Sequence, residues 1–424
     1  MVAEVREASV EFLHQPFVQP LVISSGAITE ITEARATVRV RLGAREAVGV
    51  GSIYLSDLWA WPDPNLSHRE RDGILRRLCT DLARQLPQCT GDPAHPLELG
   101  MRLHEAVLGL PIDGGAPTAL ARAMCASPFD AAIHDAAGRA LGLCAMDFYE
   151  DPVQAPSVDG LFSKGNAGEA IARLLRQEPI RTFDAWLVVG DRDDFERDVA
   201  PWVRGRRYRA IKLKIHGRDP EADARRTVEV HDAVRAMAGG AHIRLTADSN
   251  GATPGPDAAV EYLERVRALD SAAYNALEYI EQPTGRDITA EAHDWRAVAA
   301  LKPVLLDEGL TDTHALSLAE EQGWSGFALK TCKGHSFALV SAAWAAERGM
   351  SVALQDLTNP GLSAIHAALF AAFVPTINGV ELNAAQFTPA ANAEWLPRLA
   401  GLLAPEDGTH RLPVDIPAGL GGSL

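Results

Sequence analysis

Acidic and basic residues recur through the second half of the chain, each at the end of a short apolar run. The groups lie 23 to 36 residues apart and are Lys212 with Lys214, Asp248, Glu281, Asp307 with Glu308, Lys330, and Gln355 with Asp356. Each interval has room for one strand, one helix and two loops. Strands that alternate with helices at this period predict parallel βα units, and polar groups at the strand ends predict a TIM-type barrel with its active site there.

Three of these residues are carboxylates that end successive predicted strands, namely Asp248, Glu281 and Asp307. Three carboxylates at one barrel mouth repel one another unless a divalent cation binds them, and a ligand set made only of oxygen favours Mg²⁺ or Mn²⁺. The alternative is that each acid caps the helix that follows its strand. Helix capping explains one acid well and three poorly, so the sequence predicts a metal site.

The lysines are candidate proton carriers. Lys212 and Lys214 are two residues apart on a predicted strand, so both side chains point into the barrel. Repulsion between two ammonium groups lowers the pKa of one of them and can leave a neutral base near pH 7. A solvated pair at a strand end is the alternative. Lys330 ends a later strand beside Phe327 and Leu329, which predicts a place in the barrel wall, either as a catalyst or in a structural salt bridge.

Composition narrows the class of protein. The chain has 424 residues, 47% of them hydrophobic and 23% charged, and a net charge of −16, which argues against nucleic acid or anionic membrane as a partner. The start of the chain has no signal-peptide pattern and no apolar run approaches the ~20 residues that span a bilayer, so we expect a cytoplasmic protein. The five cysteines have no zinc or redox spacing and are expected as thiols, with Cys332 a possible pocket residue.

A barrel of roughly 250 residues leaves material for a second domain. We expect an α+β capping domain over residues 1–125, with 401–424 packing back on it, and the barrel over 126–400. Alternating runs predict strands at 19–23 and 36–42, and helices are predicted at 67–87 and 117–125. A further helix is predicted over 127–142, with Ser127 as its N-cap, Pro128 at its first position and Gly142 at its end. Barrel strands are expected to begin at 185–189 and to end at 379–382.

Five motifs occur in a fixed order along the chain. They are Lys-x-Lys at 212–214, Asp-x-Asn-Gly at 248–251, Ile-Glu-Gln-Pro at 280–283, Asp-Glu at 307–308 and Leu-Lys-x-x-Lys at 329–333. Together they resemble the enolase superfamily and, within it, the muconate-lactonizing subgroup of the mandelate racemase and muconate lactonizing enzyme family. The resemblance implies an α/β fold, a modified TIM barrel (β/α)₇β with an α+β capping domain. It also implies a Lys or His base that works with Mg²⁺ on an enediolate.

Residue roles follow from the resemblance position by position. Asp248, Glu281 and Asp307 would bind Mg²⁺. Lys214 would be the base on one face of the substrate, with Lys212 assisting it, and Lys330 would be the acid or base on the opposite face. Removing a proton α to a carboxylate builds a dianionic enolate, which a metal and flanking ammonium groups stabilise.

Substrate contacts are expected from a wider set. Gln355 and Glu381 are candidates for the distal end of the substrate. The family's capping loops would be 24–29 and 55–65, where two tryptophans either close over an apolar substrate or simply pack on the barrel rim. The full set of expected contacts is Asn250, Glu308, Lys333, Gln355, Asp356, Glu381, Ser24, Trp59 and Trp61.

Several departures from family patterns limit the choice of reaction. The strand after Lys330 ends in Gln355-Asp356 without a histidine, which disfavours a mandelate-type Lys/His pair and the acid-sugar dehydratases. Glu381-Leu382-Asn383 replaces the paired aspartates that bind the substrate ammonium in dipeptide epimerases. Lys333-Gly334-His335 replaces a more common Gly-Gly, and His335 is expected in a loop near the rim.

The expected reaction is therefore Mg²⁺-dependent abstraction of the α-proton of a small-molecule carboxylate. It would give racemisation or epimerisation, which two lysines slightly favour, or cycloisomerisation. A β-elimination, as in a dehydratase or an o-succinylbenzoate synthase, is the alternative on the same scaffold. A barrel hydrolase would need histidines at the strand ends, and a non-catalytic binding barrel would have lost a ligand or a lysine. A homo-oligomer, from dimer to octamer, is expected.

Overall fold

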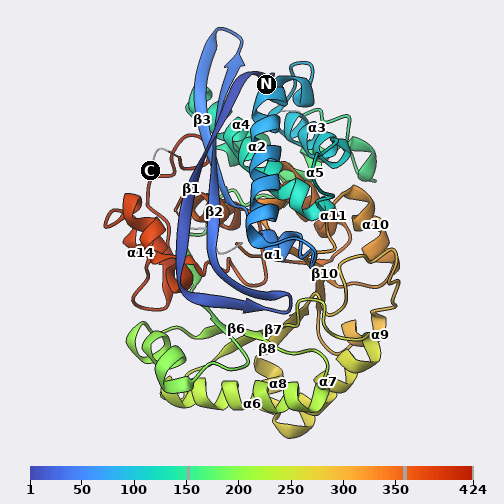
Figure 1. Cartoon of the computed structure of the whole chain (residues 1–424), viewed down its shortest axis with the longest axis vertical. Coiled ribbons are helices and arrows are strands. Elements are labelled where there is room, and N and C mark those ends of the chain that lie inside the picture. The colour runs from blue at the N-terminus through green and yellow to red at the C-terminus, as the bar shows by residue number, and fades with distance from the viewer. Residues whose placement is uncertain (150–152, 357–360, 423–424) are drawn as a thin grey trace.

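A long β-hairpin dominates the first part of the computed structural model, which describes residues 1–149, 153–356 and 361–422. Strands β1 (Glu4–Ile23), β2 (Gly26–Leu42) and β3 (Arg45–Tyr54) form an antiparallel sheet in that order. The predicted strands 19–23 and 36–42 lie inside β1 and β2. Figure 1 shows the β1–β2 hairpin, in dark blue, running down from this sheet and bending across the end of the barrel strands.

Four capping helices follow this sheet. They are α1 (Asp57–Ala60), α2 (His68–Thr90), α3 (Pro96–Gly109) and α4 (Ala119–Leu141). Two of them, α2 and α4, pack against this sheet, and the other two pack on them. The predicted helix 67–87 is α2, which begins with a capping box between Ser67 and Glu70. The predicted end of α4 is also confirmed, because Gly142 has φ 74° and closes the helix in the left-handed conformation.

The predicted start of this last helix is wrong. α4 begins at Ala119 with Thr118 as its N-cap, so Ser127 and Pro128 lie inside it. Pro128 has no N–H to donate to the carbonyl of Met124, four residues earlier. The hydroxyl of Ser127 donates to that carbonyl instead, at 2.8 Å. The hydroxyl thus satisfies the acceptor that proline leaves without its helical partner, and the helix continues.

The barrel is a parallel sheet whose strands follow chain order. They are β5 (Trp186–Val189), β6 (Ala210–Lys214), β7 (Arg244–Asp248), β8 (Leu277–Glu281), β9 (Val304–Leu306), β10 (Gly326–Leu329) and β11 (Ser351–Leu354). The helices around it are α6 (Pro220–Met237), α7 (Pro256–Leu269), α8 (Ser271–Ala276), α9 (Arg296–Ala299), α10 (Thr313–Glu321), α11 (His335–Glu347) and α12 (Gly361–Phe373). β5 is the first barrel strand, as predicted.

Shorter elements complete the chain. They are α5 (Ala167–Leu174), α13 (Ala384–Phe387), α14 (Ala400–Leu403), the antiparallel pair β4 (Thr182–Asp184) and β12 (Thr409–Arg411), 3₁₀ turns at Ala145–Tyr149, Asp159–Leu161, Thr331–Lys333 and Pro389–Trp395, and π turns at Phe195–Val199 and Pro201–Gly205.

The last predicted strand, 379–382, is not a strand in the structure. Its backbone makes a single bridge, between Glu381 and Gln355. On the side of β5, where backbone pairing would close the barrel, a side chain makes the hydrogen bonds instead. The Gln386 amide accepts from the Val188 N–H at 3.1 Å and donates to the Val188 carbonyl at 2.8 Å. A glutamine amide thus takes the place of backbone pairing beside β5.

The barrel interior explains how the polar groups converge. Tyr279, Leu305, Ala328 and Ala353 from β8 to β11 form a small buried cluster inside the barrel. Side chains alternate along a strand, so the residue two positions later points the same way. Those residues are Glu281, Asp307, Lys330 and Gln355. Each polar group therefore stands directly above an apolar residue, at the carboxyl end of the barrel.

The proposed division into two domains crosses a continuous element, because the boundary between 125 and 126 lies within α4. The described part of the tail, residues 401–422, contacts α4 as well as the first sheet. Leu420 N–H donates to Asp135 of α4 at 2.9 Å, and Gly422 lies beside Val50 of β3. Within the described part of the chain, no helix has both the length and the apolar character to cross a membrane.

Candidate active site

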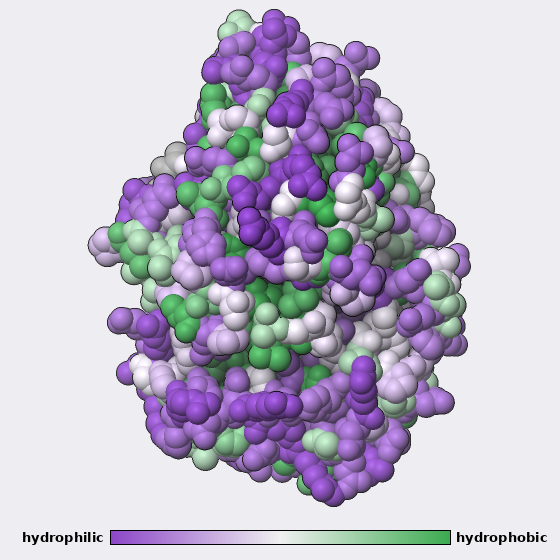
Figure 2. Space-filling model, viewed as in Figure 1, coloured by the Kyte–Doolittle hydropathy of each residue, from purple (hydrophilic) through white to green (hydrophobic). Residues whose placement is uncertain are grey.

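A cleft with about 540 Å³ of empty space lies between the carboxyl ends of the barrel strands and the β1–β2 hairpin. One side is apolar and is formed by Phe17, Leu21, Ile23, Ile28, Ile31 and Trp59. The other side is polar and is formed by Lys212, Lys214, Asp248, Asn250, Glu281, Asp307, Lys330, Asp356, Glu381 and Asn383. Figure 2 shows apolar residues gathered in the middle of this face, where the hairpin covers the barrel.

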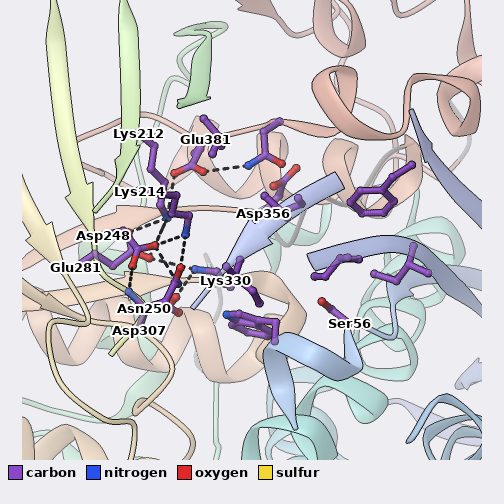
Figure 3. A pocket seen from close by; sticks show the side chains of 18 residues that line it. Ser56, Lys212, Lys214, Asp248, Asn250, Glu281, Asp307, Lys330, Asp356 and Glu381 are labelled. Carbon is purple, nitrogen blue, oxygen red and sulfur yellow. Dashed lines mark hydrogen bonds and ion pairs between the residues drawn. The ribbon is translucent and has the colours of Figure 1, made fainter. Parts of the chain in front are cut away.

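The three predicted metal ligands meet in this cleft, and each is only 1% exposed. Asp248, Glu281 and Asp307 end three neighbouring strands or directly follow them. Two ammonium groups bridge them (Figure 3). Lys212 Nζ lies 2.9 Å from Glu281 Oε2 and 3.2 Å from Asp248 Oδ2. Lys330 Nζ lies 2.6 Å from Asp307 Oδ2 and 3.6 Å from Glu281 Oε1.

The charges at this point are not fully balanced by the lysines. Burial raises the pKa of Glu281 to about 7, with repulsion from Asp248 and Asp307 acting against the attraction of Lys212. The neighbouring acid differs, because Lys330 and Lys333 outweigh burial and hold the pKa of Asp307 well below its usual range. Three buried carboxylates, one of them with its pKa raised to about 7, have the oxygen donors that suit a hard divalent cation.

The side chains are not arranged around a common point as they stand. In the described ranges, no three His, Cys, Asp or Glu side chains form a group that could hold a metal ion. The Lys212 and Lys330 ammonium groups instead bridge the carboxylates. All-oxygen donors on adjacent strand ends still fit Mg²⁺ by their chemistry.

The predicted lowering of a lysine pKa is wrong for Lys212. Burial alone would lower it, but Glu281, Glu381 and Asp248 together raise the pKa of Lys212 well above its usual value. All three carboxylates lie within 3.6 Å of its ammonium. The same holds on the other side, where Asp307 and Glu281 outweigh burial and raise the pKa of Lys330. The direction of each lysine pKa shift is set by nearby acids, which the spacing of the lysines does not reveal.

Lys214 and Lys330 flank the acids from two sides. Lys214 comes from β6, and Lys330 follows β10, so the three strands that carry the acids lie between them in the sheet. Lys214 Nζ donates to Asp248 Oδ2 at 2.5 Å and to Asn250 Oδ1 at 3.0 Å. Lys330 Nζ donates to Gln355 Oε1 and lies 5.7 Å from the centre of the Trp59 ring. A molecule held at the acids would have one lysine on each side.

The predicted substrate contacts fall into two groups. Asn250, Asp356, Glu381 and Trp59 line the cleft. The others lie behind it or at its edge and support the residues that line it. Gln355 is buried among Lys212, Lys330 and Glu281, and it donates to Glu281.

The remaining predicted contacts do not line this cleft. Lys333 donates to the Asp307 carbonyl and, at 3.0 Å, to Asp307 Oδ1. Glu308 accepts from the Trp59 indole, and Ser24 donates to the Asn250 carbonyl. Trp61 is buried, and its ring lies beside Gly115, as Ile74 of α2 does.

Of the apolar side of the cleft, Trp59 was predicted and the hairpin residues were not. The turn is only Ser24-Ser25, and the strands on both sides of it, rather than a loop 24–29, cover the barrel. Phe17, Leu21 and Ile23 lie on alternate positions of β1, a period that could have revealed them. Pro16 and Pro20 lie in this stretch of β1, which is an edge strand with a register shift between Pro16 and Leu21, where prolines are tolerated.

Two expectations near the site are wrong. His335 is not at the rim but is the buried first residue of α11, with its ring centre 4.6 Å from that of His134. Gly334, at φ 115°, turns the chain inward just before it. Cys332 is buried and does not line the cleft, and burial raises the pKa of its thiol to about 12.

The chain resembles known proteins in sequence and in structure. Residues 194–422 match the model of the family described as enolase C-terminal domain-like. A dipeptide epimerase from Enterococcus faecalis V583, complexed with Mg and the dipeptide L-Leu-L-Tyr, is 17% identical with a TM-score of 0.66, and the match covers 99% of each chain. A muconate lactonizing enzyme from Pseudomonas fluorescens, complexed with muconolactone, is 18% identical with a TM-score of 0.64, and the match covers 99% of this chain and 96% of that one.

A third solved structure is an enolase from Bradyrhizobium complexed with magnesium and mandelic acid. It is 19% identical with a TM-score of 0.64, over 99% of this chain and 96% of that one. No curated protein matches the chain in sequence. At these identities, the structural likeness establishes the fold, while residues 194–422 establish the family.

Proposed function

The chain belongs to the enolase C-terminal domain-like family, in the mandelate racemase and muconate lactonizing enzyme branch of the enolase superfamily, and we propose that it removes the α-proton of a small carboxylate substrate. The protein is an enzyme of that superfamily, an isomerase or a lyase. The observation that carries the proposal is the placement of Lys214 and Lys330 on two sides of three buried carboxylates.

Asp248, Glu281 and Asp307 would hold Mg²⁺, or Mn²⁺, which has the same preference for oxygen ligands. The ion, when bound, would supply positive charge that stabilises a substrate carboxylate as it gains negative charge. Lys212 would add a second positive charge at the same place. Its ammonium lies within 3.6 Å of three carboxylates, so its position is well determined without substrate.

The two flanking lysines would carry the proton. Lys214 Nζ takes the α-proton from one face, and the electrons of the broken C–H bond move into the carboxylate to give an enediolate. Lys330 Nζ then delivers a proton to the opposite face of the same carbon, which inverts it. We favour this racemisation or epimerisation because both lysines lie in the cleft. Cycloisomerisation or β-elimination would use one lysine for proton transfer and the other mainly for its charge.

The cleft supports a substrate with an apolar part. Six apolar side chains of the hairpin and α1 face the polar side, and they would exclude water from the reacting groups. Beyond the lysines, Glu381 and Asn383 line the cleft and are joined by a 3.1 Å hydrogen bond from the Asn383 amide. We propose that Glu381 accepts a hydrogen bond from the far end of the substrate.

An isotope experiment tests the function. A library of α-substituted carboxylic acids is incubated with the protein and Mg²⁺ in D₂O, and α-deuterium is read by NMR or mass spectrometry. Exchange of at least one acid, lost after chelation and restored by Mg²⁺, is expected. Exchange that is equally fast after exhaustive chelation would contradict the role of the ion. A Lys214→Ala, Lys330→Ala double variant controls for exchange that does not need the lysines.

A further inference from the structure

We propose that Glu308 and Asn250 are positioning residues that link the capping helix α1 to Lys214, so that Lys214 is correctly placed only when Trp59 is docked. The inference rests on the proposed function, since it concerns the placement of the proposed base. It assigns to Glu308 and Trp59 a role on Lys214 itself, in place of direct contact with substrate.

Three hydrogen bonds form the link. Trp59 Nε1 donates to Glu308 Oε1 at 2.9 Å, and Asn250 Nδ2 donates to the same oxygen at 3.3 Å. Lys214 Nζ donates to Asn250 Oδ1 at 3.0 Å. Trp59 is 6% exposed and Glu308 is 1% exposed, so water does not replace these partners easily. A residue of α1 and a residue of β6 therefore share one network, which is buried at Trp59 and Glu308 and partly exposed at Lys214.

Asn250 is fixed from several directions. Its backbone has φ 46°, a left-handed conformation that asparagine tolerates better than most residues. Its N–H donates to Asp248 Oδ1 at 2.7 Å, and its carbonyl accepts from the Ser24 hydroxyl at 3.0 Å. Ser24 lies in the turn of the hairpin. Both capping segments that reach the barrel mouth, the hairpin turn and α1, thus bear on Asn250 directly or through Glu308.

Glu308 depends on this contact. It is buried next to Asp307, and in the described part of the chain its Oε2 has no hydrogen-bond partner. Trp59 and Asn250 both donate to its other oxygen, Oε1. A buried carboxylate that loses a donor is destabilised, so movement of Trp59 would disturb Glu308 and, through it, the side chain of Asn250.

The barrel also holds the other end of Trp59. Arg286, in the loop after β8, donates from Nη1 to the Trp59 carbonyl at 2.7 Å. Trp59 is therefore held at its backbone carbonyl and at its ring nitrogen, and both partners belong to the barrel. These two contacts fix the position of Trp59 on the barrel, as a positioning link requires.

Trp59→Phe tests the link without a substrate. The variant keeps an aromatic ring near Lys330 but removes the N–H donor. Lys214 is partly exposed beside a second open space that Ser24 and Asn250 also line, so an acetylating reagent can reach it. Brief acetylation with peptide mass spectrometry gives its labelling rate relative to the exposed Lys164. Loss of one hydrogen bond, about 1 kcal/mol, predicts a labelling rate that changes about fivefold.

Matched variants separate the link from general loosening. Trp61→Phe alters a buried tryptophan two residues away that has no part in the link, and it should leave Lys214 labelling unchanged. Glu308→Ala should reproduce the Trp59→Phe change, whereas Glu308→Gln, which keeps an acceptor oxygen, should restore a rate close to the wild type. If Glu308→Ala fails to fold, the two tryptophan variants decide. Equal labelling of Lys214 in Trp59→Phe and Trp61→Phe would overturn the proposal.

Kinetics give an independent readout. With an acid found by the D₂O screen, Trp59→Phe should lower kcat for exchange about fivefold with little change in KM, because the base is misplaced while the cleft keeps its ring. A change in KM alone would show a contact with substrate and overturn the link. If no acid exchanges with the wild-type protein, the proposed function fails, and the labelling comparison still decides the link.

Discussion

The polar residues at the strand ends are the part of the site that the sequence describes best. Asp248, Glu281 and Asp307 meet, and the lysines reach them, because alternation along a strand and the parallel order of strands are enough to bring them together. Their ionisation was not predictable in this way. The pKa of Lys212 depends on Glu381, whose segment makes only one bridge to the barrel and whose approach follows from the closed fold.

The ligand role of the acids predicts a loss of both metal binding and catalysis. Asp248→Asn or Glu281→Gln removes one negative oxygen donor and should weaken Mg²⁺ binding in calorimetry. α-Proton exchange should fall by at least about 100-fold, by analogy with the loss of one stabilising donor in other active sites. The melting temperature should fall little. Tight Mg²⁺ binding in both variants would show that the ion binds elsewhere.

The two lysine faces distinguish the reactions. In a racemase, Lys330→Ala should stop inversion yet leave Lys214 able to exchange the α-hydrogen of one enantiomer, and Lys214→Ala should show the converse for the other enantiomer. In a cycloisomerase or a β-elimination enzyme, only one variant should lose exchange entirely. Deuterium incorporation into each pure enantiomer measures this. Near-normal turnover in both single variants would refute the assigned roles.

At the scale of elements, local signals mislead where tertiary contacts replace them. Ser127 and Pro128 look like a helix start, and they lie inside α4 because the hydroxyl of Ser127 satisfies the Met124 carbonyl. Pro16 and Pro20 look like strand breakers, and they lie in an edge strand. The expected strand 379–382 lacks backbone pairing on one side, where the side chain of Gln386 takes over. None of these tertiary arrangements leaves a periodic pattern in the sequence.

The Ser127 contact predicts a specific stability effect. Ser127→Ala leaves the buried Met124 carbonyl without its donor and should lower the free energy of unfolding by about 1–2 kcal/mol in urea titration. Pro128→Ala restores a backbone N–H at the break. In that background the cost of Ser127→Ala should shrink, because the helix now supplies the donor. Equal costs in the two backgrounds would mean that the hydroxyl contributes through something other than the Met124 carbonyl.

At the scale of the whole molecule, the patterns in the sequence did not predict how the capping segments pack on the barrel. Apolar periodicity predicts which face of a helix is buried but does not predict its partner. The resemblance to a family supplied the expectation that a capping domain covers the barrel, and the structure shows the hairpin as the covering element (Figure 1). One consequence was not foreseen, namely that histidines from several elements become buried between them.

These histidines predict acid sensitivity. Burial lowers the pKa of His366 and of His95 to about 3 and that of His410 to about 4. In the unfolded chain each would have a pKa near 6.5, so below that pH the unfolded state binds more protons. The stability due to each neutral histidine is therefore present above about pH 6.5 and is lost as the pH falls toward its folded pKa, at up to about 1.4 kcal/mol per pH unit.

Glu281 acts in the opposite direction, because its raised pKa of about 7 favours the folded state as the pH falls from 7 toward 4.5.

A single substitution isolates the histidine contribution. His366 lies in α12 with an Nε2 that has no hydrogen-bond partner in the described ranges, so His366→Leu removes the titrating group without breaking a bond of that atom. Urea unfolding at pH 7, 6 and 5 should show a shallower fall in stability for this variant, by about 1.4 kcal/mol per pH unit below pH 6.5. His14→Gln, at an exposed position of β1, serves as the control and should keep the wild-type slope. Parallel pH profiles for the wild type and His366→Leu would show that this histidine does not carry the acid sensitivity.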